Sequence, residues 1–464
     1  MKRRTLPGML TTDELARRVR DGSIETIVAA FPDLYGRLVG KRITGRFFLE
    51  HVLEEGMHAC DYLLACDMEM DPVPGYSFTS WEKGYGDFRP VCDLRTLRVA
   101  SWLDRTALVL CDLMEEERDE PIAVAPRSIL RRQIDAAAQR GYVAMAASEL
   151  ELYLFRDSFD QAAAKGYVGL EPLGRYIEDY HLLQGTKEEF IVGEIRRQME
   201  RSGIPIETSK GEWGPGQQEI GIEYGEVLEM ADRHAIYKHG AKEIAWQQGC
   251  GLTFMAKWDE RFAGSSCHIH ISLQDASGKA LFPAAEHGKD RASRLSDVFR
   301  WFLGGWMEHI RELFCFYAPY PSSYKRYVAG SFAPTGIAWS WDNRTAGFRI
   351  VGEGASLRIE CRAAGADANP YLAFAATLAA GLDGIENRIE PPPAFEGDVY
   401  QARDLPRVPA TLHQAIGELE RSRFARQTFT EPVIEHYLHF FRTEQRKFDE
   451  AVTDWERRRY FERA

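Results

Sequence analysis

The 464-residue sequence has no apolar run that approaches the roughly 18 residues needed for a transmembrane helix. Residues 1–10 also lack the apolar central stretch of a secretory signal peptide. Both absences argue against a membrane protein or a secreted one. We therefore expect the chain to act in the cytoplasm, without a membrane partner.

Cysteine pairs of the C-x-x-C type are also missing, although the sequence contains eight cysteines. Most of them lie in apolar stretches, such as Leu110-Cys111. Cysteines of this kind behave as small apolar residues in a reducing compartment. We predict reduced and mostly buried thiols.

An excess of positive charge is absent, because the formal net charge is -12 at pH 7. Such a surface repels a phosphate backbone, so we expect no nucleic-acid partner. The basic runs Lys2-Arg-Arg4 and Arg457-Arg-Arg459 are short and terminal, which is typical of solvated chain ends.

Internal repeats and low-complexity segments are absent too, and the apolar and charged fractions of 45% and 28% are those of a globular protein. The length suffices for one large domain and a smaller one. An acidic, proline-bearing stretch at 115–125 is the best candidate linker. The sequence thus predicts a small domain over residues 1–120 and a larger one over 121–464.

Local patterns predict a mixture of helices and strands without a strict alternation, which favours an α+β fold. Capping residues predict helices from Thr11 to about Arg20, over 127–140, between Thr186 and Gly203, from Asp232 to about Gln248, and after Asn369-Pro370. Apolar or alternating runs predict strands at 24–31, 38–43, 106–112, 143–155, 217–224, 267–273, 349–351 and 357–363.

Three predicted strands carry functional residues at alternate positions inside apolar runs: Glu149-Leu-Glu151, His268-Ile-His270-Ile-Ser272 and Arg358-Ile-Glu360-Cys-Arg362. Alternate residues of a strand share one face, so each strand has one apolar face and one polar face. Carboxylates in a dry interior require a cation. The alternatives are a solvated strand face for the two glutamates and a structural role for the histidines.

Two further segments extend this set of charged residues. The turn Gly211-Glu-Trp-Gly-Pro-Gly-Gln-Gln-Glu219 adds two acids, and Asn343-Arg-Thr-Ala-Gly-Phe-Arg349 adds two arginines. Five glutamates and one histidine suit Mg²⁺ or Mn²⁺ better than zinc, and arginine suits phosphate or carboxylate oxygens. This combination indicates phosphoryl transfer. No Walker motif and no kinase glycine loop is present, so an ATP site of another type is implied.

Eight motifs, in this order, resemble the glutamine synthetase family, type I, over nearly the whole chain. They are residues 148–155 (SELELYLF), 211–219 (GEWGPGQQE), 253–257 (TFMAK), 264–272 (GSSCHIHIS), 323–326 (SYKR), 343–346 (NRTA), 358–362 (RIECR) and 368–372 (ANPYL). The resemblance implies a small β-grasp domain followed by a catalytic domain with a curved antiparallel sheet backed by helices. It also implies a dodecamer of two stacked hexameric rings, with active sites between subunits.

The same resemblance implies roles for individual residues. Glu151, Glu212 and Glu219 would bind one metal ion, and Glu149, His268 and Glu360 another, with two to three Mg²⁺ or Mn²⁺ ions in each site. The L-glutamate site would contain Glu151, Gly264, Arg326 and Arg362. The ATP site would contain His270, Ser272, Arg344, Arg349 and Arg358, and Arg344 and Glu360 would act in catalysis.

The sequence departs from the family where ammonium binds. Gly330-Ser-Phe-Ala-Pro334 stands where the family usually has Gly-Tyr-Glu-Ala-Pro, so Phe332 replaces a carboxylate. The small-domain motif Phe-Asp-Gly-Ser-Ser is missing from residues 75–87. Ala263 and Ala355 replace an asparagine and a lysine of the family.

These changes leave the ATP and glutamate halves of the site and alter the amine half. They resemble the γ-glutamyl polyamine, putrescine, ethanolamine and alkylamine ligases of the family. We therefore expect an ATP-dependent ligase that joins glutamate to a primary amine, with Phe332, Trp81, Glu82 and Tyr85 as candidates for the amine pocket. Glu82 and Asp87 are candidate bases.

Four other hypotheses remain open at this level. The chain would be a true glutamine synthetase that uses ammonium, a non-catalytic ring protein, or a phosphotransferase without a ligation step. The fourth hypothesis is that Phe332 is a neutral substitution, which leaves the choice of amine unchanged. Tyr400, in a loop that some family members adenylylate, is expected to be an ordinary exposed tyrosine.

Overall fold

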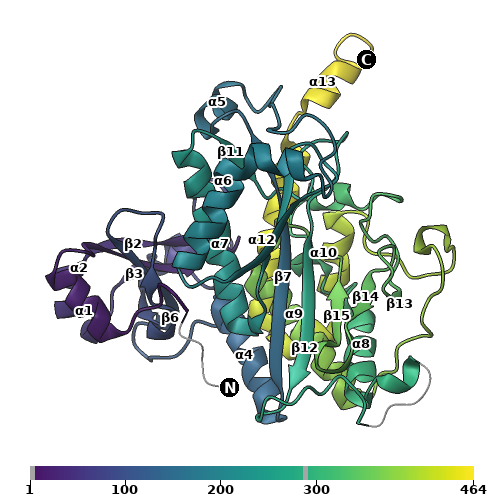
Figure 1. Ribbon diagram of the computed structural model, residues 1–464, viewed down its shortest axis with the longest axis horizontal. Helices are drawn as coiled ribbons and strands as arrows, with labels where there is room; N and C mark the ends of the chain where they lie inside the picture. Colours follow the sequence, from purple (N-terminus) through teal and green to yellow (C-terminus); the bar gives the residue numbers. More distant parts are fainter. Residues whose placement is uncertain (1–5, 286–290) are drawn as a thin grey trace.

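The computed structural model describes residues 6–285 and 291–464. Its small part contains a six-stranded sheet of order β2-β1-β6-β4-β3, with β5 on β6 (purple to blue in Figure 1). A β1–β2 hairpin is followed by the returning strand β6, which pairs parallel to β1, as in a β-grasp unit. The strands are β1 (Thr26–Pro32), β2 (Leu38–Thr44), β3 (Ala59–Cys60), β4 (Asp87–Cys92), β5 (Arg98–Val99) and β6 (Thr106–Glu115).

The large part contains a nine-stranded sheet of order β13-β14-β15-β12-β7-β9-β8, with β10 and β11 also on β7. Every pairing in it is antiparallel except β13 with β14. Long β7 and β12 lie side by side at its centre (Figure 1). The strands are β7 (Val143–Phe155), β8 (Ile206–Gly211), β9 (Gln217–Ile222), β10 (Gly225–Glu226), β11 (Gly251–Thr253), β12 (Cys267–Gln274), β13 (Trp339–Trp341), β14 (Phe348–Val351) and β15 (Arg358–Cys361).

Helices cover the large sheet, and the most apolar of them, α9, is buried on almost every side. Close approach of α8 to α9 depends on glycine: a methyl group at Gly305 would lie 2.3 Å from the carbonyl oxygen of Ala380. The helices are α1 (Thr12–Arg20), α2 (Gly45–Phe47), α3 (Leu53–Glu55), α4 (Pro126–Gln139), α5 (Phe159–Ala164), α6 (Leu182–Arg201), α7 (Val227–Gln247), α8 (Asp297–His309), α9 (Pro370–Asn387), α10 (Leu412–Arg421), α11 (Arg423–Phe429), α12 (Glu431–Glu450) and α13 (Asp454–Tyr460).

The predicted α+β class is confirmed, and each of the eight predicted strands is present with bounds within three residues. Strand β8 was not predicted, because as the edge strand of its sheet it is mostly polar and partly exposed. The capping box of Thr11 and Glu14 and the Asn369 cap are also confirmed. These signals are local and therefore visible in the sequence.

Two predicted helix starts are wrong. Helix α6 begins at Leu182, and the Thr186 hydroxyl donates 2.9 Å to the Leu182 carbonyl inside its first turn. Helix α7 begins at Val227, so Asp232 is not its cap. Asp232 is instead buried and accepts hydrogen bonds of 3.0 and 2.8 Å from the Arg127 guanidinium.

Arg127 also connects the two parts of the molecule. Its guanidinium donates 2.8 Å to Asp93 and contacts Asp112, both of which belong to the small part, as well as Asp232 of the large part. A buried charge with several carboxylate partners is costly to disrupt. The two sheets occupy residues 26–115 and 143–361, and the exact domain boundary near residue 120 stays a prediction.

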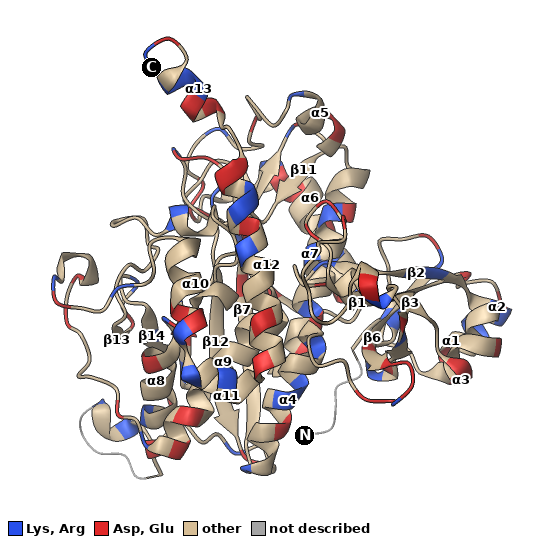
Figure 2. Ribbon diagram, turned by 180° about the vertical axis from the view of Figure 1, so that it is seen from behind, with Lys and Arg blue, Asp and Glu red and all other residues tan. Residues whose placement is uncertain are grey.

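On the rear face of the molecule, acidic and basic side chains are interspersed along α12, which packs its apolar residues inward (Figure 2). Helix α13 projects from the body with the C-terminus (Figure 1). All eight cysteines are free, and six of them are buried. Among the described residues, no helix has the length and apolar character to cross a membrane.

Candidate active site

The polar faces of four neighbouring strands, β15, β12, β7 and β9, meet on one side of the large sheet. In the pairing register, His268 of β12 lies opposite Glu149 of β7, and His270 lies opposite Glu360 of β15. On the other side of β7, Glu151 pairs with Glu219 of β9. Because alternate residues of a strand share a face, these side chains all point to the same surface, as predicted.

The first group of candidate metal ligands contains Glu149, His268 and Glu360, whose ligand atoms lie within 4.8 Å of one another. This is one of the two ligand sets that the resemblance implied. Glu149 lies 3.2 Å from His268 Nδ1 and 3.1 Å from His270 Nε2. Glu360 accepts 2.9 Å from Arg349 and 2.5 Å from Arg362.

The electrostatics of this group favour ionised carboxylates and a neutral imidazole. Burial opposes ionisation of Glu360, but His268, His270 and Arg362 together lower its pKa to about 2. Burial also lowers the pKa of His268, to about 4, and Arg362 adds to this effect. A neutral imidazole next to carboxylates is the form that binds a metal ion.

A second group contains Glu151, Glu219 and again His268, also within 4.8 Å. Ser266 donates to Glu151 twice, from its backbone N–H at 2.7 Å and from its hydroxyl at 2.8 Å. Glu212, the third predicted ligand, lies nearby, but its carboxylate contacts the Lys210 ammonium. Glu212 therefore lies at the site as predicted, but its carboxylate pairs with Lys210, which the sequence analysis did not identify.

Unlike the first group, this one is short of positive charge. Burial and the neighbouring Glu212 raise the pKa of Glu151 to about 7. Burial and the same neighbour raise the pKa of Glu219 to about 9. Buried carboxylates that repel one another in this way fit a divalent cation, and oxygen ligands favour Mg²⁺ or Mn²⁺.

A cavity of about 790 Å³ opens beside the first group. Of the predicted ATP-binding residues, His270, Arg349 and Arg358 line it, whereas Ser272 does not and Arg344 is exposed without a partner among the described residues. Arg291, Arg294 and Trp341 also line the cavity. The sequence analysis missed these three, because only the fold brings their separate segments to β14 and β15.

Two of the predicted glutamate-binding residues, Arg326 and Arg362, are buried. One Arg326 nitrogen, Nη2, donates to the carbonyl groups of residues 362–364 at 2.6–3.1 Å. The Nε atoms of both arginines have no hydrogen-bond partner among the described residues, as expected for donors that await an anion. A methyl group at Gly264 would lie 2.4 Å from Arg326 Cγ, so glycine is required there.

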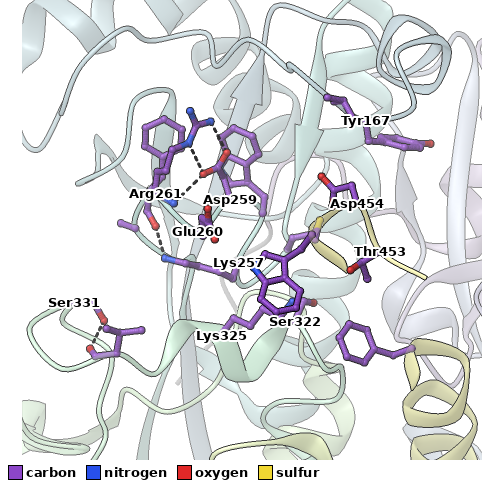
Figure 3. Close-up of a pocket in the computed structure, with 18 of the residues that line it drawn as sticks. Tyr167, Lys257, Asp259, Glu260, Arg261, Ser322, Lys325, Ser331, Thr453 and Asp454 are labelled. Atoms are coloured by element: carbon purple, nitrogen blue, oxygen red, sulfur yellow. Dashed lines mark hydrogen bonds and ion pairs between the residues drawn. The ribbon is translucent and has the colours of Figure 1, made fainter. Parts of the chain in front are cut away.

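A larger cavity, about 1490 Å³, lies on the other side of the site. Its walls come from the loop at 255–263, the flap at 328–332 and the C-terminal segment at 448–458; Figure 3 shows Lys257 and Asp259 across the cavity from Thr453 and Asp454. Phe332 lines it and is 46% exposed. Trp213, which was not predicted, lines it too, and its position directly after Glu212 was the available signal.

The other predicted amine-pocket residues are not part of this cavity within one chain. Trp81 and Glu82 lie in a short 3-10 helix of the small part, followed by Tyr85, and none of them lines either cavity. Trp81 is 73% exposed and packs edge-on against Tyr85. Their role therefore remains a prediction that requires a neighbouring subunit.

Comparisons with known proteins find similar sequences over almost the full length of this chain. The family model described as "Glutamine synthetase, catalytic domain" matches residues 123–460. A gamma-glutamylethanolamide synthetase of Streptomyces coelicolor is 48% identical over 98% of this chain and 96% of its own length. A glutamate–isopropylamine ligase of a Pseudomonas species is 37% identical over 95% of both chains.

More distant relatives include the glutamine synthetase of Thermotoga maritima, 31% identical over 97% of this chain and 99% of its own length. The solved structure "Apo GmaS without ligand" superposes with a TM-score of 0.84 at 27% identity, and the match covers 97% of this chain and 100% of the other. Similarity of sequence and of fold thus extends over both parts of the molecule.

Proposed function

The chain belongs to the glutamine synthetase family, and from this premise we propose that it is an ATP-dependent γ-glutamyl amide ligase. It joins the γ-carboxylate of L-glutamate to a primary amine by way of γ-glutamyl phosphate. The relatives named for ethanolamide and isopropylamine products support an amine with a carbon chain.

One observation carries the choice of an amine over ammonium. The flap residue Phe332 packs against Trp213 with ring centroids 5.8 Å apart, directly beside the metal ligand Glu212. Two apolar rings at this point bind a carbon chain well, whereas ammonium requires carboxylates or other polar partners. The true glutamine synthetase hypothesis has no comparable feature in its favour.

Different side chains bind the two substrates, glutamate at one end of the site and ATP at the other. Arg326 and Arg362 hold the carboxylates of glutamate, and Arg349 and Arg358 bind phosphate groups in the smaller cavity, with Arg344 free to move onto the transferring phosphoryl group. Divalent ions, when bound by Glu149, Glu151, Glu212, Glu219, His268 and Glu360, supply the neutralising charge that phosphoryl transfer needs. The γ-carboxylate takes the terminal phosphoryl group of ATP, and ADP leaves. The amine nitrogen then attacks the γ-carbonyl carbon, so the C–N bond of the amide forms and inorganic phosphate leaves.

The amine must first lose a proton. An alkylammonium of pKa near 10.4 costs roughly 4 to 5 kcal/mol to deprotonate at pH 7. Of the two candidate bases, Glu82 is exposed in the small part and Asp87 begins strand β4 there, outside both cavities. Either acts only if a neighbouring subunit delivers it.

We extend the proposal to the assembly and the compartment. A dodecamer of two hexameric rings would place the small part of one subunit over the site of the next and bring Trp81 and Tyr85 to the amine. Free cysteines support a reducing, cytoplasmic location. Light scattering after size exclusion measures the mass of the assembly, and a monomer with full activity would contradict this arrangement.

The decisive experiment measures phosphate release with glutamate and ATP, comparing ammonium with ethanolamine, isopropylamine, aniline, putrescine and spermine, with the product identified by mass spectrometry. We expect a γ-glutamyl amide and little turnover with ammonium. Highest turnover with ammonium would make the chain a true glutamine synthetase. A phosphorylated product without an amide would make it a phosphotransferase, and absence of ATP and metal binding would make it a non-catalytic protein.

The variant Phe332→Glu tests the flap directly. Restoring a carboxylate at this position should raise ammonium-dependent turnover and lower turnover with alkylamines. Val328→Glu is a matched control, because it adds the same charge to the same flap at a side chain that lines the cavity and is 53% exposed. Equal behaviour of the two variants would show that Phe332 is a neutral substitution.

A further inference from the structure

Most carboxylates that line the larger cavity already accept hydrogen bonds or form ion pairs within the chain. A cavity that binds a cation would instead offer carboxylates without such partners. Four of the five carboxylates of the larger cavity already have partners in the chain. Asp259 accepts 2.9 and 2.6 Å from Arg261, Asp454 lies 2.5 Å from Arg458, Glu456 accepts 2.6 Å from the Thr453 backbone, and Asp449 accepts 2.8 Å from Gln445. Only Glu260, which is exposed, has no hydrogen-bond or salt-bridge partner among the described residues.

The basic groups of the cavity are engaged as well. The Lys257 ammonium donates to the Phe262 carbonyl, and Lys325 lies 5.2 Å from the ring centroid of Phe448. A second ammonium group on a bound amine would therefore find no free, desolvated carboxylate to offset the cost of leaving water. The charge arrangement disfavours diamines and polyamines.

The apolar wall of the cavity is built at its inner end. Trp213 follows the proposed metal ligand Glu212 in a turn that packs closely on Tyr153, since a methyl group at Gly214 would lie 1.8 Å from the Tyr153 hydroxyl. The Trp213 ring meets Phe332 at an interplanar angle of 62°. Both rings remain about half exposed to the cavity, at 49% and 46%.

The flap that carries Phe332 is held in an unusual backbone conformation. Phe332 has φ of 58°, in the left-handed region that non-glycine residues seldom occupy. The Ser331 hydroxyl donates 2.6 Å to the Val328 carbonyl on one side, and the Tyr400 hydroxyl donates 3.0 Å to the Ala333 carbonyl on the other. Tyr400 is thus half-buried and structural, not an ordinary exposed tyrosine.

We infer that Trp213, together with Phe332, determines which amine is used and selects a monoamine with a short uncharged tail, alkyl or hydroxyalkyl. The tail packs on the two rings, and the reacting nitrogen points toward the γ-carboxyl of glutamate. This inference rests on the proposed ligase function. It adds a residue and a narrower substrate class to it.

The test compares amines of equal length that differ only at the far end. With n-butylamine and putrescine as one pair, and n-propylamine and 1,3-diaminopropane as another, we expect kcat/KM at least about tenfold higher for each monoamine, the size of effect of one unmatched group in a pocket. Equal or better use of the diamines would overturn the inference while leaving the ligase function intact. No amide with any amine would overturn the function itself.

Variants test whether the effect on the amine is specific to Trp213 or is shared by other side chains that line the cavity. Trp213→Ala should raise the KM for n-butylamine by about 10- to 100-fold, with the KM for ATP and glutamate unchanged, and Trp213→Phe should restore most of the loss. Trp455→Ala removes another tryptophan that lines the same cavity, 52% exposed on α13, and should change the amine KM less than twofold. Equal effects of the two alanine variants, or a matching rise in the glutamate KM, would contradict the assignment.

Discussion

The two groups of metal-binding side chains differ in how their charge is balanced before any metal arrives. In the first group, Arg349 and Arg362 hold Glu360 at 2.9 and 2.5 Å, and its pKa is lowered to about 2 despite its burial. In the second, burial and repulsion by Glu212 raise the pKa of Glu151 to about 7 and that of Glu219 to about 9.

This difference shows which group has its negative charge balanced by the chain itself, without a bound ligand. In the first group His268, His270 and Arg362 keep Glu360 ionised. Arg362 and Arg349 are also residues that we propose for glutamate and phosphate, so substrate and metal would share one set of counter-ions. The second group depends on a cation for its own stability, and Lys210 provides one, with its ammonium against Glu212 and 4.0 Å from Glu219. We expect metal to bind the second group with release of protons.

The largest effect is expected from Glu360→Gln. This change removes a carboxylate that the metal and two arginines share, so amide formation should fall by about 10³-fold or more. Phosphate release measures it. Glu308→Gln is the matched control, because Glu308 is an exposed residue of α8 that lines neither cavity, and the activity of this variant should stay within about twofold. More than a tenth of the activity in Glu360→Gln would show that the first group is not essential.

A smaller effect is expected where the two groups touch. The Ser266 hydroxyl donates 2.8 Å to Glu151 and lies 2.9 Å from His268 Nε2, so it links them. Hydrogen bonds to charged groups contribute about 1.5 to 3 kcal/mol, so Ser266→Ala should weaken Mn²⁺ binding by about 10- to 150-fold in calorimetric titration. Ser340→Ala, which removes a hydroxyl from β13, is the control. Unchanged affinity would mean that the two groups bind metal independently.

Lys210→Met tests the counter-ion of the second group. Without a competing ammonium, Glu212 is free for the metal, and Mn²⁺ should bind about five- to tenfold more tightly in the absence of nucleotide. Lys257→Met removes an ammonium that donates to the Phe262 carbonyl and should leave the affinity unchanged. Weaker binding in Lys210→Met would indicate that Lys210 orients Glu212 for the metal instead of competing with it.

The smallest effect concerns stability and pH in EDTA. In the folded state the pKa of Glu219 is raised from 4.5 to about 9, so the folded state holds this proton more tightly than the unfolded state does. The contribution of Glu219 to the free energy of unfolding therefore decreases as the pH rises from 4.5 to 9. Between pH 6 and 9 the Tm of the wild type should fall by about 3 °C more than that of Glu219→Gln. The lowered pKa of Glu360 acts only below pH 4.5, and a Glu360→Gln variant should keep the wild-type slope above pH 6. Parallel curves for wild type and Glu219→Gln would contradict the comparison.

Much of the site was predictable because strands repeat every two residues. That period places Glu149 with Glu151 and His268 with His270, whatever the rest of the chain does. Caps at Thr11 and Asn369 are local in the same sense. The two wrong helix starts, at Thr186 and Asp232, have different causes. The Thr186 hydroxyl donates to the Leu182 carbonyl inside the same helix, whereas Asp232 pairs with the distant Arg127.

By itself, the sequence determined the family, the chemical type of the metal ligands and the loss of a carboxylate at Phe332. Only the tertiary structure decided which side chains meet: Lys210 at Glu212, Trp341 with Arg291 in the smaller cavity, and Trp213 at Phe332, a pair 119 residues apart in the chain. The physical reason is that strand periodicity acts between near neighbours. Contacts across sheets and loops depend instead on how distant segments pack.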